Sequence, residues 1–268
     1  IDAIGGEMNA NTGNEHTQFY IKAASKHFPL IFEVLTDMLK NPLFDPLELE
    51  KEKGVIVEEI NMYKDTPMYE IENILEKEMW PKDPLGRSIA GTKETVKKFD
   101  QIMFQCYIGA HYQPSNIILG ISGKYNQKHF SELVRKNWSV LRQKATDGWK
   151  KSKDSQNSLR AKIEYKKTEQ AHLSLGFKGF AYNDSRNTAQ LILSVILGGG
   201  MSSRLFTEVR EKRGLAYYIS ASGSNFQDTG IFNVRAGVPI DKIQGALKVI
   251  ISELVKVKRE EVREYELK

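Results

Sequence analysis

The feature that most constrains the fold of this chain is an order of elements that occurs twice. The segment MNANTGNEHTQFYIKA (residues 8–23) contains a strand of small residues, a polar turn and a second strand, and an amphipathic helix follows it. The segment ISASGSNFQDTGIFNVRA (residues 219–236) has the same order and is also followed by such a helix. Strands joined by short polar turns pair antiparallel. The order favours two α+β domains, each with an antiparallel sheet packed against helices, over one βαβ domain, and leaves open whether the halves arose by duplication.

Hydrophobic periodicity predicts where the other elements lie. We expect the first hairpin within residues 4–24, with its turn at Gly13 and Asn14. In the first half, helices are predicted over residues 26–40, 46–80 and 127–141, shorter helices over 92–112, and a strand over 116–123. In the second half, strands are predicted over residues 161–167, 171–177, 216–224 and 230–237, and helices over 184–197, 202–212 and 239–256, with a helix-like pattern at the end of the chain.

The stretch between the two halves has the composition of a linker. Residues 142–160 are rich in Lys, Ser, Asp and Gln and contain few apolar residues. We therefore predict a first domain over residues 1–145, a linker over 146–160 and a second domain over 161–268.

Composition excludes several classes of protein. With 268 residues, 40% of them hydrophobic, the chain can bury one large or two medium cores. No apolar run approaches the roughly 20 residues that a membrane-spanning helix needs, so membrane insertion is not expected. The net charge of +5 is modest, and its densest basic stretch lies in the polar linker, so a nucleic-acid partner is not expected either. The single cysteine, Cys106, excludes intrachain disulfides and a cysteine-based metal cluster.

One carboxylate occupies an unusual place in the predicted helix 46–80. At 3.6 residues per turn, Glu52 and Glu59 lie almost on one line along the helix. The helical neighbours of Glu59 are Val55, Ile56, Met62 and Tyr63. Two interpretations are open: the side chain reaches water or pairs with a lysine such as Lys64, or it sits in a partly dry site because it binds a metal or another cation. An unpaired buried carboxylate is costly, so the second case requires a partner.

Other candidate chemistry is incomplete. None of the five histidines forms the i, i+3 or i, i+4 pair that places two imidazoles on one helix face, so no complete zinc site can be written. The glycines 198–200 lack the spacing of a phosphate-binding loop and instead indicate a helix break. Arg210 and Tyr217 lie on either side of Gly214, a candidate helix C-cap, and are either surface residues or donors directed at one carbonyl or oxyanion.

Five stretches together resemble the insulinase/pitrilysin family of zinc peptidases, and most of all its mitochondrial processing peptidase branch with its bacterial relatives. They are IDAIGGEMNANTGNEHTQFY, EKEKGVIVEEINMYKDTP, DPLGRSIAGT, YQPSNIILGISG and LGGGMSSRLFTEVREKRGLAYYISA. The resemblance implies a metallopeptidase fold of repeated α+β domains that pair as a clam-shell around a chamber. It also implies a homodimer or heterodimer with another family member.

The resemblance also implies roles for particular residues. In this family two histidines of an inverted His-x-x-Glu-His motif and a later glutamate hold the zinc ion, and the motif's own glutamate is the general base. The later ligand matches Glu59, and the carboxylate that supports it matches Glu52. Arg210 and Tyr217 match the pair that contacts substrate near the scissile bond, and the glycine-rich segment matches 198–200. The strand to which substrate adds matches Asn9, Ala10, Asn11 and Thr12.

The His-x-x-Glu-His motif itself does not occur in the sequence. We therefore expect a fragment of a longer peptidase, truncated at both ends, that cannot assemble the zinc site and is inactive alone. The full-length protein is expected to be a zinc endopeptidase that cleaves unstructured peptides or presequences. The alternative is a catalytically inactive structural or partner subunit of the same family. The sequence does not fix the compartment, which would be the cytoplasm for a bacterial protein and the mitochondrial matrix for a eukaryotic one.

Overall fold

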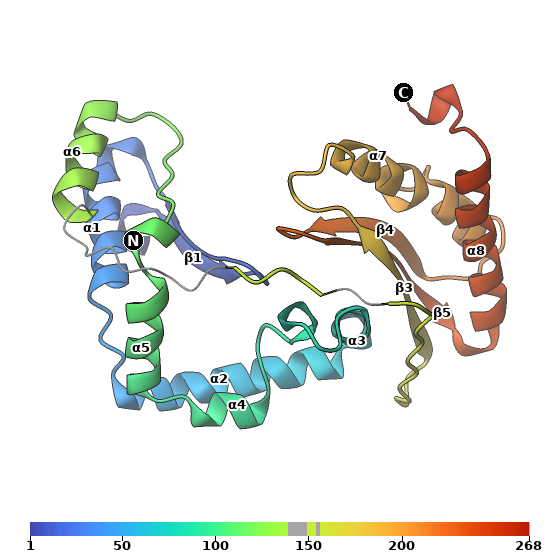
Figure 1. The fold of residues 1–268 in the computed structure, drawn as a ribbon, viewed down its shortest axis with the longest axis horizontal. Coiled ribbons are helices and arrows are strands. Elements are labelled where there is room, and N and C mark those ends of the chain that lie inside the picture. The colour runs from blue at the N-terminus through green and yellow to red at the C-terminus, as the bar shows by residue number, and fades with distance from the viewer. Residues whose placement is uncertain (139–148, 154–155, 268) are drawn as a thin grey trace. The chain divides into compact units, whose positions relative to one another are not determined.

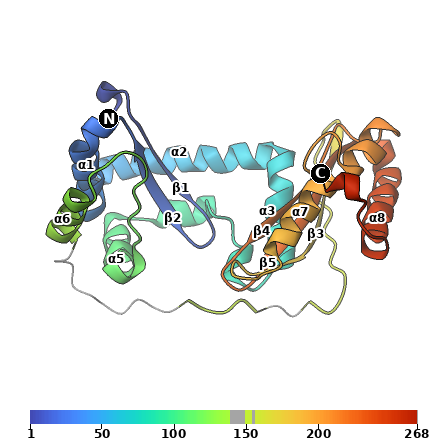
Figure 2. The same ribbon diagram turned by 90° about the horizontal axis from the view of Figure 1, so that it is seen from above.

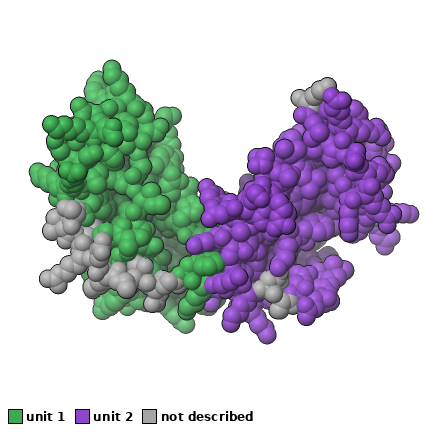
Figure 3. All heavy atoms as spheres, turned by 45° about the horizontal axis from the view of Figure 1, so that its top comes forward, with its two compact units in different colours: residues 1–60, 89–150 green, residues 61–88, 151–268 purple. Residues whose placement is uncertain are grey.

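The computed structural model describes residues 1–138, 149–153 and 156–267, and its fold is α+β (Figure 1). The chain forms two compact units, the first from residues 1–60 and 89–150 and the second from residues 61–88 and 151–268 (Figure 3). Each contains an antiparallel sheet accompanied by helices, which confirms the predicted fold class. The domain boundaries at residues 145 and 160 stay predictions. Within the described residues, no helix combines the length and the apolar character that a membrane span needs.

The first unit is built on a hairpin. Strands β1 (Glu7–Thr12) and β2 (Thr17–Lys22) pair antiparallel with Ala10 opposite Phe19 (Figure 2). The hairpin is confirmed, and helices occur within each of the four predicted helical regions: α1 (Phe28–Lys40), α2 (Pro46–Asp65), α4 (Lys93–Lys98), α5 (Gln101–His111) and α6 (Gln127–Trp138). Short 3₁₀ turns occur at Asp2–Ile4, Ser25–His27 and Pro114–Asn116. Rings of Phe28 and Phe32 on α1 meet that of Phe130 on α6, so an aromatic cluster joins these two helices.

The second unit is built on a three-stranded sheet. Its strands are β3 (Gln170–Gly179), β4 (Tyr218–Asn225) and β5 (Gly230–Pro239), in the order β3-β5-β4 with every pair antiparallel. Its helices are α3 (Pro67–Met79), α7 (Asn187–Gly198) and α8 (Ile243–Arg259), with a π-helical segment at Phe206–Glu211. Short 3₁₀ turns occur at Pro84–Gly86, Ile240–Lys242 and Glu264–Glu266. The predictions for both strands of the hairpin β4-β5 and for α7 and α8 are thereby confirmed.

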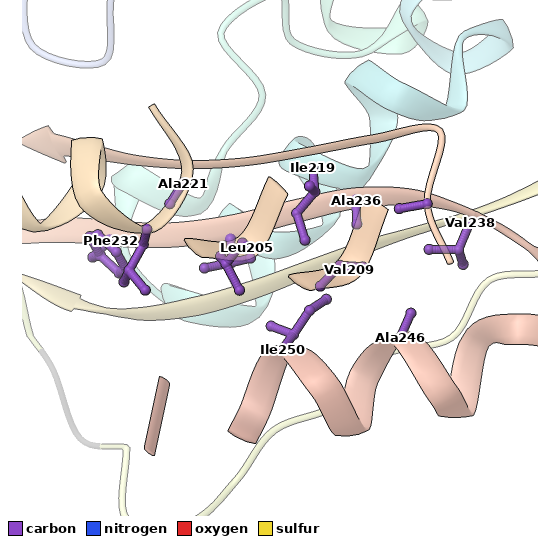
Figure 4. Close-up of a cluster of buried hydrophobic side chains, with 12 residues drawn as sticks. Leu205, Val209, Ile219, Ala221, Phe232, Ala236, Val238, Ala246 and Ile250 are labelled. Carbon is purple, nitrogen blue, oxygen red and sulfur yellow. The ribbon is translucent and has the colours of Figure 1, made fainter. Parts of the chain in front are cut away.

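One face of this sheet carries the core of the second unit. Successive strand residues point to opposite faces, so Val234, Ala236 and Val238 of β5 share one face, and all three are fully buried. Leu205 and Val209 lie against that face together with residues of α8 (Figure 4). Burying each aliphatic side chain of this size contributes roughly 1.5–3 kcal/mol. The π-helical segment and α8 are therefore fixed to the sheet by its buried face.

The predicted helix over residues 46–80 is wrong in one respect, because two helices occur there. Thr66 has an extended backbone, with φ −108° and ψ 92°, and separates α2 from α3. Pro67 explains the break, since proline has no N–H for the helix and disfavours a helical conformation in the residue before it. The helix predicted over 202–212 is present, but its centre is π-helical.

Two predicted strands are wrong. Residues 116–123 and 161–167 form no strand, and Ile118, Ile163 and Tyr165 are 98%, 92% and 92% exposed. A strand needs a hydrogen-bonded neighbour, and no described strand pairs with either segment. The helix-like pattern at the end of the chain gives one 3₁₀ turn, Glu264–Glu266, after α8 has ended at Arg259. Residues 139–141 of the helix predicted over 127–141, and part of the predicted linker, lie outside the described residues.

The opposite face of the sheet carries a polar network. The Nδ1 atom of His172 on β3 and the hydroxyl of Tyr218 on β4 are 2.9 Å apart. Arg235 on β5 donates to the Ser220 hydroxyl at 3.0 Å and forms an ion pair with Glu72 on α3. Burial lowers the pKa of His172 and raises the pKa of Tyr218. The network therefore holds a neutral imidazole and a neutral phenol beside an ion pair that ties α3 to the sheet.

The lowered pKa of His172 predicts a pH-dependent stability. The unfolded chain takes up a proton at this residue near pH 6.5, whereas the folded chain does so only at lower pH. The free energy of unfolding should therefore decrease as the pH falls from above 6.5 toward the folded-state pKa. Urea titrations at a series of pH values should show this decrease, and His172→Asn should reduce it.

The exposed His16 offers a matched control. The variant His16→Asn, in the hairpin turn, should leave the pH dependence as in the parent. If the free energy of unfolding of His172→Asn decreases with falling pH as much as that of the parent, the partly buried imidazole is not the source of the pH dependence.

Candidate functional site

Glu59 lies in the second half of α2 as a half-buried carboxylate directly before the buried Ile60. Among the described residues it has no hydrogen-bond or ion-pair partner, and Lys64 does not pair with it. Glu52, two turns earlier on the same helix, is exposed and likewise has no such partner there. A half-buried carboxylate with no partner in the described part of the chain is a candidate group to bind a cation.

The apolar neighbours of Glu59 do not enclose it. Val55 and Met62 are 58% and 52% exposed, whereas Ile56 and Tyr63 are partly buried. The carboxylate thus lies at the border between an apolar, exposed side of α2 and its buried side. The structure confirms the placement of these residues around Glu59 but not a dry pocket formed by them.

The described residues do not form a complete metal centre. No group of three His, Cys, Asp or Glu side chains among them lies close enough to hold a metal ion. Catalytic zinc sites use three protein ligands and keep a fourth position for water or substrate. Glu59 is one residue of a ligand type that zinc accepts, and the described residues contain no complete set of three.

Strand β1 has an accessible edge. All six of its residues are exposed, and within the described residues it pairs with β2 along one edge only. Asn9, Ala10, Asn11 and Thr12 belong to this strand, and the Asn9 side chain accepts a hydrogen bond from the Ala10 N–H at 2.8 Å. A hollow of about 170 Å³ lies beside it, lined by Met8, Asn9, Ala10, Phe19, Leu35 and Met38. An exposed edge strand beside an apolar hollow can accept an extended peptide as an additional strand.

The glycine-rich segment owes its first glycine to close packing. A Cβ atom at Gly198 would lie 2.1 Å from the backbone nitrogen of Ala221, so the end of α7 touches strand β4 directly. Gly199 follows as the helix C-cap, and a Cβ atom at Gly200 would meet nothing within 4 Å. The expected helix break is confirmed. The absence of a side chain matters at Gly198 and also at Gly199, where a Cβ atom would lie 2.7 Å from the Cα atom of Val195.

Arg210 and Tyr217 flank a tight turn in the second unit. Gly214 has φ +56°, and its N–H donates to the Arg210 carbonyl at 2.9 Å, which confirms it as a C-terminal cap. The Tyr217 N–H donates to the Gly237 carbonyl at 2.8 Å, so the start of β4 is fixed to β5. Both side chains are exposed, and neither forms a hydrogen bond or ion pair within the described residues. Arg210 therefore lies in the π-helical segment and Tyr217 directly before β4, and no hydrogen bond or ion pair joins their side chains within the described residues.

Two features of this region were not predicted. Arg204 donates two hydrogen bonds to Glu266, at 2.5 and 2.7 Å, which lower the pKa of that carboxyl. Both side chains are largely buried, so this ion pair attaches the last 3₁₀ turn to the start of the π-helical segment. The Arg210 guanidinium lies over the Phe206 ring, 4.9 Å from its centroid. The i, i+4 spacing of these two residues in a helical pattern could have indicated the second contact.

The packing of Gly198 gives a testable difference between neighbouring glycines. Gly198→Ala should lower the free energy of unfolding by about 1–3 kcal/mol, because α7 or β4 must move away to admit a methyl group. Gly200→Ala is the matched control and should change it much less. Equal unfolding free energies for the two variants in urea titrations would contradict the close contact between α7 and β4.

Comparison with known family models matches nearly the whole chain. Residues 1–93 match the model described as insulinase, peptidase family M16. Residues 100–268 match the model described as the peptidase M16 inactive domain.

Individual proteins match along the same length. The uncharacterized zinc protease YmxG of Bacillus subtilis is 34% identical over 267 residues, covering 100% of this chain and 64% of the relative. An uncharacterized zinc protease of Streptomyces coelicolor is 36% identical over 261 residues, covering 95% of this chain and 57% of the relative. The chain thus spans less than two thirds of the length of either relative. The crystal structure of a protease from Helicobacter pylori has the same fold, with a TM-score of 0.93 at 24% identity, over 99% of this chain and 65% of that chain.

Proposed function

This chain belongs to the insulinase family, peptidase family M16, and we propose that the protein that contains it is a zinc-dependent endopeptidase acting on unstructured peptides. The whole-chain matches to relatives named zinc proteases support a peptidase. Within the structure, the proposal depends chiefly on Glu59, a half-buried carboxylate with no partner among the described residues.

In this proposal Glu59 contributes one zinc ligand. The other ligands come from residues outside the described part of the chain, because no group of three candidate ligands exists within it. When bound, zinc would polarise the scissile carbonyl and lower the pKa of a bound water. Glu52, on the same side of α2, is proposed to support the ligand, since groups around a metal site orient its first ligands.

The substrate is proposed to bind as an extra strand on β1. Residues Asn9 to Thr12 lie on an exposed strand whose outer edge pairs with no described strand. Backbone hydrogen bonds to such an edge hold a peptide in extended form largely independently of its sequence. This mode of binding selects unfolded peptides, because a folded protein cannot offer a free extended segment.

Arg210 and Tyr217 are proposed to contact the substrate near the bond that is cleaved. A guanidinium and a phenol can both donate to a carbonyl oxygen that gains negative charge. Their exposure and their lack of partners within the described residues leave these donors free. In the clam-shell arrangement of this family they come from the domain that faces the zinc, in many members on a second subunit, so we also propose that the protein works as a dimer around an enclosed chamber.

A second candidate function is an inactive structural or partner subunit. The description of the model matched by residues 100–268, an inactive domain, is compatible with it. The free carboxylate of Glu59 and the free donors of Arg210 and Tyr217 favour an enzyme, because an inactive subunit has no need for these groups.

The role of Glu59 can be tested by removing its charge. In the full-length protein, Glu59→Gln should lose zinc and reduce peptide cleavage by at least about 100-fold, because an amide is a much weaker zinc ligand than a carboxylate. Zinc content by mass spectrometry and cleavage of an unstructured fluorogenic peptide measure the two effects. Glu58→Gln, which changes the adjacent exposed carboxylate, is the control and should keep both. Normal zinc content in Glu59→Gln would refute the ligand assignment.

The substrate contacts predict a different result. Arg210→Met and Tyr217→Phe should each lower kcat by about 10²-fold, the usual loss when one donor to a developing oxyanion is removed. Zinc content should stay at the parent value, since neither residue is a proposed ligand. Loss of zinc in either variant, or unchanged kcat in both, would argue against these contacts.

A further inference from the structure

The Arg210 side chain is positioned by an aromatic ring and not by a carboxylate. Its guanidinium lies 4.9 Å from the centroid of the Phe206 ring, within the range of a cation–π contact. A guanidinium stacked on a ring keeps its N–H groups in its own plane, where they stay available to another acceptor. An ion pair would instead occupy some of those donors.

Glu208, a carboxylate in the same π-helical segment, already has two cationic partners. Glu208 accepts hydrogen bonds from Lys212 and Arg213, both at 2.6 Å. These bonds lower the pKa of Glu208 and keep it ionised. Arg213 also donates to the Glu208 backbone carbonyl at 2.7 Å, which fixes this carboxylate away from other donors. Glu208 therefore binds Lys212 and Arg213, and within the described residues Arg210 forms no ion pair.

The ring itself is anchored. Leu205 and Val209, the residues directly before Phe206 and Arg210, are fully buried in the core of the second unit (Figure 4). Phe206 is partly buried and packs against that core. The Lys212 N–H donates to the Thr207 carbonyl at 2.9 Å, the i→i−5 bond of a π-helix, a local geometry found frequently at functional sites. Phe206 thus contacts both the buried core and the Arg210 guanidinium.

We propose that Phe206 is a positioning residue that holds the Arg210 guanidinium over its ring with all its donors free for the substrate. This inference rests on the proposed substrate contact of Arg210 and adds the group that directs it. Phe206 itself does not touch the reacting atoms. Its role is to limit the motion of a long side chain, so that less conformational freedom is lost when a peptide carbonyl binds.

The test combines two kinds of measurement on the full-length protein. Cleavage of an unstructured fluorogenic peptide gives kcat/KM for Phe206→Leu, Phe206→Tyr, Arg210→Met and the double variant Phe206→Leu/Arg210→Met. Phe206→Met replaces Phe206→Leu if the smaller side chain prevents folding. Selective ¹⁵N-arginine labelling gives the chemical shift of the Arg210 Nε–H, identified by its loss in Arg210→Met.

We expect Phe206→Leu to lower kcat/KM by about fivefold, the strength of an exposed cation–π contact, and to shift the Arg210 resonance. Phe206→Tyr, which keeps the ring, should retain the parent kcat/KM and the parent Arg210 resonance. In the Arg210→Met background, Phe206→Leu should lower kcat/KM no further. An equal loss in both backgrounds would show that the ring only supports packing and would overturn the positioning role. If Arg210→Met lowers kcat/KM but Phe206→Leu does not, the positioning role is overturned while the proposed substrate contact of Arg210 still holds. Full activity of Arg210→Met would instead overturn the substrate contact on which the inference rests.

Discussion

The second unit depends on the burial of one face of the sheet β3-β5-β4. The central strand β5 places Val234, Ala236 and Val238 on that face with no exposed surface. Leu205 and Val209 are fixed against them, which determines where Phe206 and Arg210, each one residue further along, emerge at the surface. The Gly214 turn and the pairing of β4 with β5 then set the position of Tyr217. The candidate substrate contacts are therefore consequences of core packing and not of a flexible loop.

In the first unit, the candidate site consists of groups that have no binding partner among the described residues. Glu59 is half-buried without a partner, and β1 offers an unpaired edge within the described residues. Each feature leaves hydrogen-bonding groups that a partner can use, the carboxylate oxygens of Glu59 and the outer backbone edge of β1. A metal ion with further ligands and an extended peptide would supply those partners. Glu59 and the edge of β1 are the parts of the proposed zinc and substrate sites that the first unit contributes.

Much of the fold could be predicted from the sequence, because polar turns separate the strands of both hairpins and the helical periodicity marks the helices. The wrong predictions concern strand pairing and the effect of proline on the helix backbone. Residues 116–123 and 161–167 have strand-like composition, yet composition does not reveal whether a neighbouring strand exists. The break before Pro67 was visible in the sequence, but the apolar pattern continuing beyond it suggested one helix.

The candidate site was less predictable than the fold. Periodicity placed Glu59 and Glu52 on one side of a helix, but it did not indicate whether Glu59 binds a metal ion or is simply solvated by water. The residues around Gly214 suggested Arg210 and Tyr217 as donors to a carbonyl or oxyanion only as one of two alternatives, and the substrate roles of these residues and of β1 came from the resemblance. The most direct test of the account is a crystal structure of the full-length protein with anomalous diffraction data at the zinc absorption edge. The account predicts an anomalous peak about 2.0–2.2 Å from a carboxylate oxygen of Glu59. A zinc peak bound entirely by other residues, with Glu59 away from it, would contradict the account.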